Sequence, residues 1–398
     1  MVFRILIPIL ILLFTFNILT ARVFYMSVIR HYPKPVSWSY LLINMGFIGA
    51  IGIQVYAMAE GTDFFSPDKY MVLFIYYYLL FYLPQFVYVL FSGISKLAKD
   101  NAGVIRGIGS IAAAFLFFTM LWGHFVTTKK FEVREYSISS PKIPQSFNDY
   151  RIVQFSDLHV GNFNNDTALI RHLVDTINHL NPDLILFTGD LVTYHSKEVI
   201  PYMQQLSALN AKYGVYAILG NHDYSDYHRW ANEKEKEKDF EYFKTLVGKL
   251  GWRMLNNESV RITKDSSSIV LAGMENWGEP PFPTHGDLTA TLETVNPDKK
   301  EFILLMSHNP EFWRHKVQNK RKDIDLTLSG HTHAMQMKVS IAGKVFSPAA
   351  MRYPLWGGLH TDRNNSKIII NEGIGNVFYP MRIGALPEIS VITLNSNQ

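Results

Sequence analysis

The sequence predicts an α/β domain with a sheet of largely parallel strands, preceded by four transmembrane helices. Four uncharged apolar runs occupy the first 130 residues, and each is long enough to cross a bilayer. From residue 150 onward, apolar strand-like segments alternate with segments of helical periodicity, which favours a parallel sheet. These strand-like segments end in Asp, Asn and His. Such ends are where α/β sheets bind ligands.

The membrane prediction rests on the length of the apolar runs. A spanning helix needs about 20 mostly apolar residues. A cleaved signal peptide is the alternative for the first run, but Leu19-Thr20-Ala21 is a poor cleavage site and three more runs follow. We therefore predict a membrane domain over residues 1–130. Its four transmembrane runs are residues 5–21, 35–59, 70–95 and 107–128.

The charge distribution limits both function and topology. Residues 1–128 carry the whole net charge of +4, so the globular part has no basic excess and we expect no nucleic-acid partner. The interiors of the apolar runs lack Asp, Glu, Lys and Arg, which favours an anchor over a transporter. The loops at 22–34 and 96–106 hold six Lys/Arg against five on the opposite side. Positive-inside counting thus predicts, by one charge, a multi-pass cell-membrane protein with residues from about 129 onward outside the cytoplasm.

The absence of cysteine restricts the chemistry of the globular part. It excludes disulfides, thiolate metal sites and cysteine nucleophiles. Any metal must therefore be bound by His, Asp, Glu, Asn or backbone oxygen.

The globular domain is expected over residues 150–398, after a linker with a first strand at residues 131–149. Its first half has the order strand, helix, strand, helix, strand, which predicts parallel pairing. The expected strands are 150–155, 183–187, 214–219, 303–306 and 326–328, and the expected helices are 167–180 and 198–210.

Five of these strands end in side chains that can bind metal. A single His after a strand is more often a hydrogen-bonded turn residue than a ligand. Residues at i and i+2 on extended chain face the same side, so each paired motif presents two groups together. Five such ends in one chain predict a metal centre. The candidate residues are Asp157, His159, Asp190, Asn221, His222, His308, His331 and His333.

The residue types indicate two divalent ions. Ions about 3.5–4 Å apart need a charged bridging ligand, which Asp190 can provide. Neutral imidazoles and the amide oxygen of Asn221 can complete the coordination. A mixed nitrogen and oxygen set without sulfur suits Mn, Fe, Zn, Co or Ni better than Ca or Mg. Glycines at 189, 220 and 330 would let the backbone turn sharply beside the ions.

These motifs, in order, are Asp-x-His, Gly-Asp, Gly-Asn-His-Asp, a lone His and Gly-His-x-His. Over residues 150–395 the sequence resembles the calcineurin-like metallophosphoesterases. The resemblance implies a four-layer α/β/β/α sandwich with two mixed sheets, and metal-dependent hydrolysis of phosphoric esters. It implies that one ion is bound by Asp157, His159, Asp190 and His333, and the other by Asp190, Asn221, His308 and His331.

The resemblance also implies the catalytic roles. Water activated by the two ions would attack phosphorus in line. His222 would be the general acid or transition-state donor, and Asp223 could orient it. The family usually continues its last motif with Gly-Gly-Gln, but here the residues are Ala334-Met335-Gln336. The ligands precede this change, so we expect hydrolysis to survive and Met335 to add an apolar contact near the substrate.

The segment Tyr-Pro-Leu-Trp-Gly-Gly-Leu at 353–359 is similar to the membrane-associated branch, the transmembrane proteins with a metallophosphoesterase domain. Some members of that branch are UDP-2,3-diacylglucosamine hydrolases. The resemblance therefore implies a phosphodiester or pyrophosphate substrate, including a lipid-linked one, and a lipid bilayer as partner. That precursor is made in the cytoplasm, which conflicts with the charge count, and the oligomeric state stays open.

The alternative function is a catalytically silent metal-binding sensor or scaffold coupled to the membrane bundle. Such a module would show degraded ligand positions, and none of the positions in this sequence is degraded.

Overall fold

The computed structural model describes residues 2–59, 69–280, 282–295, 300–377 and 379–396, with the side chains of residues 2–14, 58, 59, 69, 71 and 99 outside the description. The chain divides into two compact units. One comprises Met1–Phe125 with Phe378–Met381, and the other comprises Val126–Val377 with Arg382–Gln398.

The first unit is built from long apolar helices. They are α1 (Val2–Ser27), α2 (Lys34–Ala59), α3 (Lys69–Ser95) and α4 (Ala102–Phe125). Three stretches, Lys34–Ala57, Val72–Ser95 and Ala102–Lys129, are long and apolar enough to cross a membrane, which confirms three of the four predicted spans. The run at 5–21 lies in α1, much of it outside the described side chains, so that span stays a prediction.

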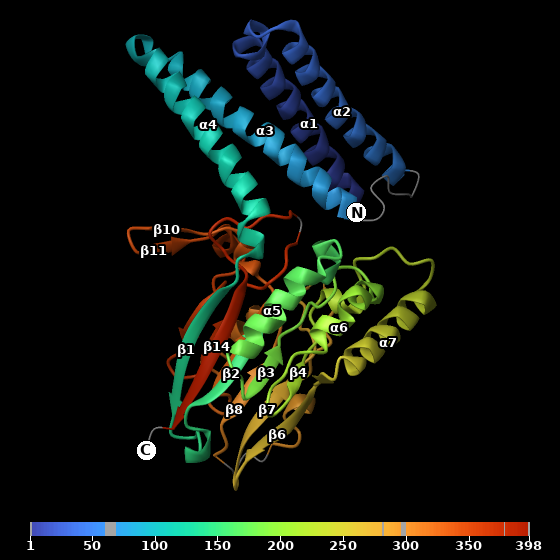
Figure 1. Cartoon of the computed structure of the whole chain (residues 1–398), viewed down its shortest axis with the longest axis vertical. Coiled ribbons are helices and arrows are strands. Elements are labelled where there is room, and N and C mark those ends of the chain that lie inside the picture. Colours follow the sequence, from blue (N-terminus) through green and yellow to red (C-terminus); the bar gives the residue numbers. More distant parts are fainter. Residues whose placement is uncertain (1, 60–68, 281, 296–299, 378, 397–398) are drawn as a thin grey trace. The chain divides into compact units, whose positions relative to one another are not determined.

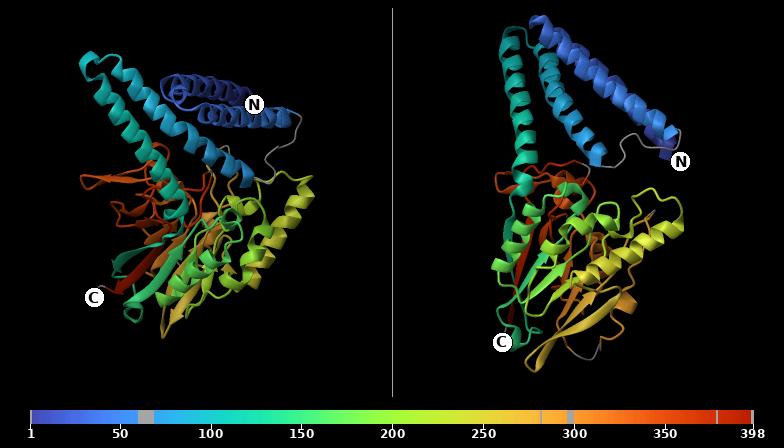
Figure 2. Two further views of the ribbon diagram at one scale, coloured as in Figure 1. Left: turned by 45° about the horizontal axis from the view of Figure 1, so that its top comes forward. Right: turned by 45° about the vertical axis from the view of Figure 1, so that its right-hand side comes forward.

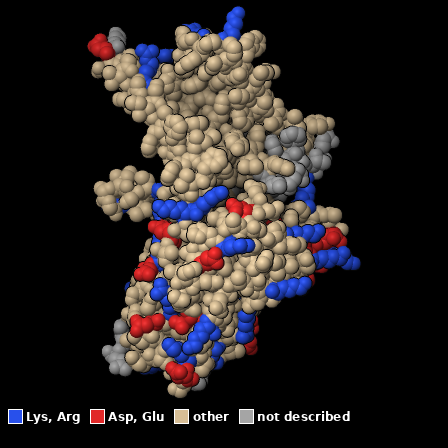
Figure 3. Space-filling model, viewed as in Figure 1, with Lys and Arg blue, Asp and Glu red and all other residues tan. Residues whose placement is uncertain are grey.

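Polar side chains inside this unit bind one another. The Tyr40 hydroxyl donates to Gln85 Oε1 at 2.7 Å, and the Tyr82 hydroxyl donates to Asn44 Oδ1 at 2.9 Å. Both bonds join α2 to α3. Because an unsatisfied polar group costs several kcal/mol in lipid, such pairing suits a membrane bundle. Figure 3 shows few Lys, Arg, Asp or Glu over this unit, in contrast to the second unit.

The second unit contains two six-stranded mixed sheets. The first has the order β1-β14-β2-β3-β4-β5, and β2, β3, β4 and β5 run parallel. Strand β14 enters antiparallel to β2, and β1 pairs parallel with β14. Its strands are β1 (Glu132–Ser140), β2 (Tyr150–Phe155), β3 (Leu184–Phe187), β4 (Val215–Ala217), β5 (Arg253–Met254) and β14 (Glu388–Ser396).

The second sheet has the order β12-β13-β9-β8-β7-β6. Strands β7, β8, β9 and β13 are parallel, and an antiparallel strand closes each edge. Its strands are β6 (Glu258–Lys264), β7 (Ser267–Gly273), β8 (Ile303–Met306), β9 (Leu326–Ser329), β12 (Gly358–Thr361) and β13 (Lys367–Ile370). A separate hairpin consists of β10 (Val339–Ile341) and β11 (Lys344–Phe346).

Three apolar layers hold these sheets and helices together (Figure 1). Helices α5 (Thr167–His179) and α7 (Glu233–Lys249) cover the outer face of the first sheet, where the amphipathic α5 buries its apolar face. Leu186 of β3 and Leu304 of β8 meet between the two sheets. Phe312 and Trp313 cover the outer face of the second sheet. The arrangement is the α/β/β/α sandwich that the resemblance implied.

One predicted helix is interrupted. Residues 198–210 form a 3-10 segment, Ser196–Tyr202, followed by the short helix α6 (Met203–Leu206). Pro201 lies inside the 3-10 segment, where its missing N–H cannot support a regular α-helix. The remaining short elements are α8 (Leu288–Thr291), α9 (Pro310–Phe312) and the π-helical turn Trp313–Val317.

Candidate metal centre

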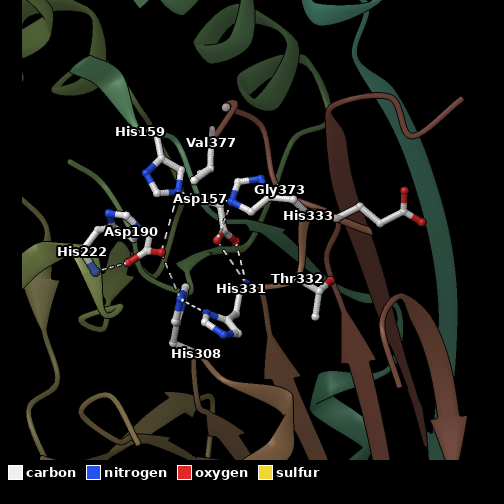
Figure 4. A network of polar contacts seen from close by, with 12 residues as sticks. Asp157, His159, Asp190, His222, His308, His331, Thr332, His333, Gly373 and Val377 are labelled. Carbon is white, nitrogen blue, oxygen red and sulfur yellow. Dashed lines mark hydrogen bonds and ion pairs between the residues drawn. The ribbon is translucent and has the colours of Figure 1, made fainter. Parts of the chain in front are cut away.

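The polar strand ends of both sheets converge on one buried site (Figure 4). Among the described residues, the site contains three groups of potential ligands. Within each group, the potential ligand atoms lie within 4.8 Å of one another. Side chains from five separate strand ends meet there because the carboxyl ends of parallel strands lie at one edge of each sheet. The groups are Asp157, His159 and His333; His159, Asp190 and His222; and Asp190, His308 and His331.

In the first group, the potential coordinating atoms of Asp157, His159 and His333 point toward one another. His333 Nε2 lies 3.2 Å from Asp157 Oδ1 and 3.2 Å from His159 Nε2. All three residues are buried. Two imidazole nitrogens and a carboxylate oxygen at these separations could hold a divalent ion.

The other two groups share the Asp190 carboxylate. Asp190 Oδ2 lies 3.1 Å from His308 Nε2 and 3.7 Å from His159 Nε2, so it stands between the two groups. His331 Nδ1 lies 3.3 Å from His308 Nε2, and Asn221 Oδ1 lies 3.2 Å from the same nitrogen. This placement is the one that a bridging carboxylate requires.

The hydrogen bonds of the imidazoles fix which nitrogen faces the centre. His308 Nδ1 donates to the Thr188 carbonyl at 2.8 Å, which leaves Nε2 toward Asp190. His331 Nε2 donates to the Tyr353 hydroxyl at 3.0 Å, which leaves Nδ1 toward His308. Metal-binding histidines commonly use their second nitrogen in this way.

The backbone of the site is strained. Five candidate ligands adopt positive φ, a conformation that L-residues rarely take: Asp157 (53°), His159 (46°), Asp190 (62°), His331 (77°) and His333 (49°). Such conformations persist only where the surrounding structure enforces them, and they cluster at functional sites.

Two of the glycines are required by this packing. Gly189 has φ of 97°, which favours glycine. A Cβ on Gly330 would lie 2.0 Å from Ser156 Oγ and 2.3 Å from Asp157 Oδ2. The glycine before the last His pair therefore lets the two sheets approach at the site.

Buried carboxylates here stay ionised because of the histidines. Burial by itself raises the pKa of Asp190, but His308 and His222 hold it well below its ordinary value. In the same way, His333 holds the pKa of Asp157 below its ordinary value against the effect of burial. Both acids therefore offer charged oxygens at neutral pH.

Most of the imidazoles stay neutral. Burial lowers the pKa of His159 and His222, and burial together with His308 lowers the pKa of His331 to about 3. Burial also opposes the charging of His308, but Asp190 outweighs it and the pKa of His308 rises to about 9. Neutral imidazole is the form that binds metal, and an ion would replace the extra proton of His308.

His222 belongs to the group of His159 and Asp190, but the resemblance gives it a catalytic role instead of a ligand role. Its Nδ1 donates to the Thr193 carbonyl at 2.8 Å, and its backbone N–H donates to Asp190 Oδ1 at 2.8 Å. Its ring packs edge-on against His159, with the centroids 4.7 Å apart. The nitrogen left for chemistry is therefore Nε2.

We expected Asp223 to orient His222, but the structure gives Asp223 other partners. Its buried carboxylate accepts the backbone N–H groups of Asp190 at 2.8 Å and Gly220 at 2.9 Å, and of the two residues after Asp190. Asp223 thus ties the loop of Asp190 to the loop of Asn221, and Thr193 orients the His222 ring.

Sequence reasoning missed two tyrosines at the site. Tyr353 accepts the His331 bond described above, and Tyr227 stacks on His222 with centroids 4.2 Å apart. The Tyr227 hydroxyl accepts from Asn221 Nδ2 at 2.9 Å. Tyr227 is one of 21 tyrosines and lies in a loop without periodic pattern, so the sequence carried no signal for it. Tyr353 begins the segment 353–359 that resembles the membrane-associated branch, but the resemblance did not assign it to the site.

Two charged residues support the site from behind. The Glu198 carboxylate accepts the backbone N–H of Thr193 at 2.6 Å, next to the carbonyl that holds His222. The buried Arg382 guanidinium donates to the carbonyls of Glu372 and Gly375, and its Nη2 lies 3.2 Å from His333 Nδ1. The Glu198 bond closes a local loop, whereas the Arg382 contact joins His333 to a segment 49 residues further along the chain.

A fourth acidic group lies apart from this centre. It consists of Glu279, Glu311 and His315. Arg352 donates to Glu279 at 2.6 Å and Arg314 donates to Glu311 at 2.8 Å, so both carboxylates already have cationic partners. We assign no metal to it.

Comparisons with known proteins agree with the fold and the convergence of these motifs. The family model described as calcineurin-like phosphoesterase matches residues 150–335. The uncharacterized metallophosphoesterase YkuE of Bacillus subtilis is 30% identical over 283 residues, which cover 69% of this chain and 89% of that protein.

Two further relatives carry more specific names. The transmembrane protein with metallophosphoesterase domain of Danio rerio is 27% identical over 336 residues, covering 80% of this chain and 71% of that protein. The UDP-2,3-diacylglucosamine pyrophosphatase LpxG of Chlamydia trachomatis is 24% identical over 338 residues, covering 73% of this chain and 97% of that protein. The identity with YkuE over most of that protein's length shows that this chain belongs to the calcineurin-like phosphoesterase family, whose members are generally metal-dependent hydrolases.

Proposed function

We propose that this protein is a membrane-anchored phosphoesterase that uses two divalent metal ions to hydrolyse a phosphodiester or pyrophosphate bond. The observation that carries the proposal is the Asp190 carboxylate, which faces one His/Asp group on each side. Three apolar stretches long enough to span a bilayer supply the anchor.

The donor set fits such a centre. It offers ionised carboxylates and imidazole nitrogens without sulfur, which suits Mn, Fe, Zn, Co or Ni. Asp190 would bridge the ions. The proposed ligands of one ion are Asp157, His159, Asp190 and His333, and those of the other are Asp190, Asn221, His308 and His331.

When bound, the ions supply an activated water and offset negative charge on the phosphoryl oxygens. The chain positions the rest of the chemistry. With Nδ1 of His222 held by Thr193, its Nε2 is free to pass a proton to the leaving-group oxygen. An anionic phosphoryl group in the site favours the protonated imidazole that this step needs. Tyr227 stacks on the ring and limits its rotation.

A lipid-linked substrate is the finer part of the proposal. The similarity to LpxG and the membrane anchor support UDP-2,3-diacylglucosamine or a related nucleotide-linked lipid. That substrate requires a cytoplasmic site, whereas the charge count of the loops favours the opposite side. A reporter fused to the C-terminus will locate the catalytic unit, and an extracytoplasmic result would count against this substrate.

The decisive experiment combines metal analysis with an activity screen of the full chain in detergent. The screen compares a generic phosphodiester, a phosphomonoester and a nucleotide-linked lipid. We expect about two ions per chain and hydrolysis of a diester or pyrophosphate bond. Bound metal with no hydrolysis of any of the three would instead favour the catalytically silent sensor or scaffold.

Two variants test the assigned roles. Asp190→Ala should abolish hydrolysis and lower the metal content, whereas His222→Ala should lower kcat by about 10²–10⁴-fold with metal retained. Asp175→Ala and His179→Ala are matched controls, because both residues are exposed on α5. Full activity in either site variant would refute the mechanism.

A further inference from the structure

The hairpin of β10 and β11 exposes an unusual amount of apolar side chain. Val339, Ile341, Val345 and Phe346 are each between 52% and 59% exposed. The register pairs Val339 with Phe346 and Ile341 with Lys344, so Val339, Ile341 and Phe346 share one face. A hairpin of six strand residues thus carries bulky apolar groups that the rest of the unit does not cover.

The hairpin also lacks a sheet to join. In the part of the chain that the structure describes, β10 and β11 pair only with each other. The hairpin projects from the catalytic unit in Figure 1 and in the left view of Figure 2. Because an isolated two-stranded hairpin is marginally stable in water, and exposed apolar groups in one patch mark an interaction site, a covering partner is expected.

Residues 382 and 383 connect the base of the hairpin to the C-terminal end of the last candidate span. Lys338 N donates to the Ile383 carbonyl at 2.8 Å, and the Thr127 hydroxyl donates to the neighbouring Arg382 carbonyl. Thr127 lies within the apolar stretch Ala102–Lys129, only two residues after α4. The chain therefore brings the hairpin base within a few residues of the membrane exit of that span.

The charges around the hairpin suit a lipid surface. Residues 339–361 contain no Asp or Glu, and Lys344 lies at the end of the tight turn, where β11 begins. A Lys beside apolar groups at a membrane surface can reach the phosphate headgroups. An acidic rim would be repelled by an anionic leaflet, and this stretch has none.

We propose that the β10–β11 hairpin inserts the side chains of Val339, Ile341 and Phe346 into the headgroup layer of the bilayer that holds the spans. After the hairpin, the Ser347 hydroxyl donates to the Ala334 carbonyl at 2.7 Å, one residue after His333. This bond connects the hairpin to the segment that carries His333, a proposed metal ligand. This inference does not depend on which bond the site hydrolyses.

The test uses the absence of native cysteine, which allows one labelled position at a time. Ile341→Cys and Phe346→Cys are labelled with a polarity-sensitive fluorophore in the full chain, reconstituted into lipid nanodiscs. Ser266→Cys is the matched control, because it lies exposed in the turn of another hairpin, between β6 and β7. Unchanged thermal transitions of the labelled proteins verify that they are folded.

We expect both hairpin labels to emit at shorter wavelength than the control label. Brominated lipids should quench them several-fold more than they quench the control, and aqueous iodide should quench mainly the control. Equal iodide quenching at Ile341 and Ser266 would overturn the proposal. Protection from both quenchers would also overturn it, since the cover would then be protein, such as a second copy of the chain.

Discussion

The second unit buries two clusters of acidic residues, and the clusters differ in the groups that neutralise their charge. In the candidate metal centre, the ion pairs formed by Asp157 and Asp190 with described residues are all to histidines. Near the start of β14, Arg134 Nη1 binds Glu372 at 2.8 Å and Glu388 at 2.9 Å. Both acids of the second cluster are buried as deeply as those of the first.

This contrast separates a functional cluster from a structural one. Lys338 adds a second cation on Glu372 at 2.8 Å, so the Arg134 cluster carries its own countercharge. Transfer of a charge from water into the protein interior costs free energy, and a permanently charged cation beside it offsets that cost. The metal centre has imidazoles in place of Lys or Arg. Its countercharge comes from protonated histidine such as His308, and bound metal ions would replace that proton. The predictions below test that difference.

Removal of metal should have the largest effect on hydrolysis. We expect a chelator to reduce hydrolysis to background and to lower the thermal midpoint of the full chain, because the centre loses its cations. A metal held at 100 times its Kd stabilises by about 2.7 kcal/mol. Added Mn²⁺ should restore both properties. In Asp190→Ala the chelator should shift the midpoint much less, and an equal shift would place the stabilising metal elsewhere.

The stability contributed by the Arg134 cluster should depend on its own cation and not on added metal. Arg134→Met leaves Glu388 buried without its main cation and should destabilise the protein by about 3–5 kcal/mol, measured by denaturant unfolding in detergent. Excess metal should not rescue it. Arg261→Met is the control, since its pair with Glu301 is partly exposed and should contribute about 1 kcal/mol or less. Equal losses of stability in the two variants would mean that burial does not determine how strongly these ion pairs stabilise the protein.

Glu198 provides a test based on pH. Burial raises its pKa from 4.5 to about 7, although the backbone N–H groups of Thr193 and Tyr194 oppose this. A folded-state pKa above the unfolded value means that stability is greatest below the unfolded pKa and is lost as pH rises through the folded pKa. The loss between about pH 4.5 and 7 should approach 3 kcal/mol.

Glu198→Gln should remove that part of the pH dependence. The difference in thermal midpoint between variant and wild type should therefore shift in favour of the variant as pH rises through about 7. A difference that stays constant with pH would show that Glu198 is ionised in the folded protein throughout this range.

The sequence was enough to predict the parallel strands and the side chains that follow them. Apolar runs that end in Asp, Asn or His can be recognised from the spacing of their apolar residues and from the place of the polar residue after them. The hydrogen-bond partners of these side chains could not be predicted in this way. His222 is held by the carbonyl of Thr193, an atom that every residue has, so no residue type marks it. Tyr353 and Arg382 reach the site from distant loops, and their contacts exist only once the second sheet has packed against the first.

The smallest effect concerns the residues directly after the last His pair. Ala334 and Met335 have φ of 50° and 45°, positions where a side chain costs about 1–2 kcal/mol. Ala334→Gly should therefore stabilise the protein by about 1 kcal/mol in denaturant unfolding. Ala349→Gly is the control, because Ala349 is equally buried and lies outside the residues with positive φ, so it should destabilise. Hydrolysis should not change in either variant, since all the proposed ligands precede residue 334. Destabilisation by Ala334→Gly would mean that packing of the buried Ala334 methyl outweighs the relief of strain in this left-handed turn.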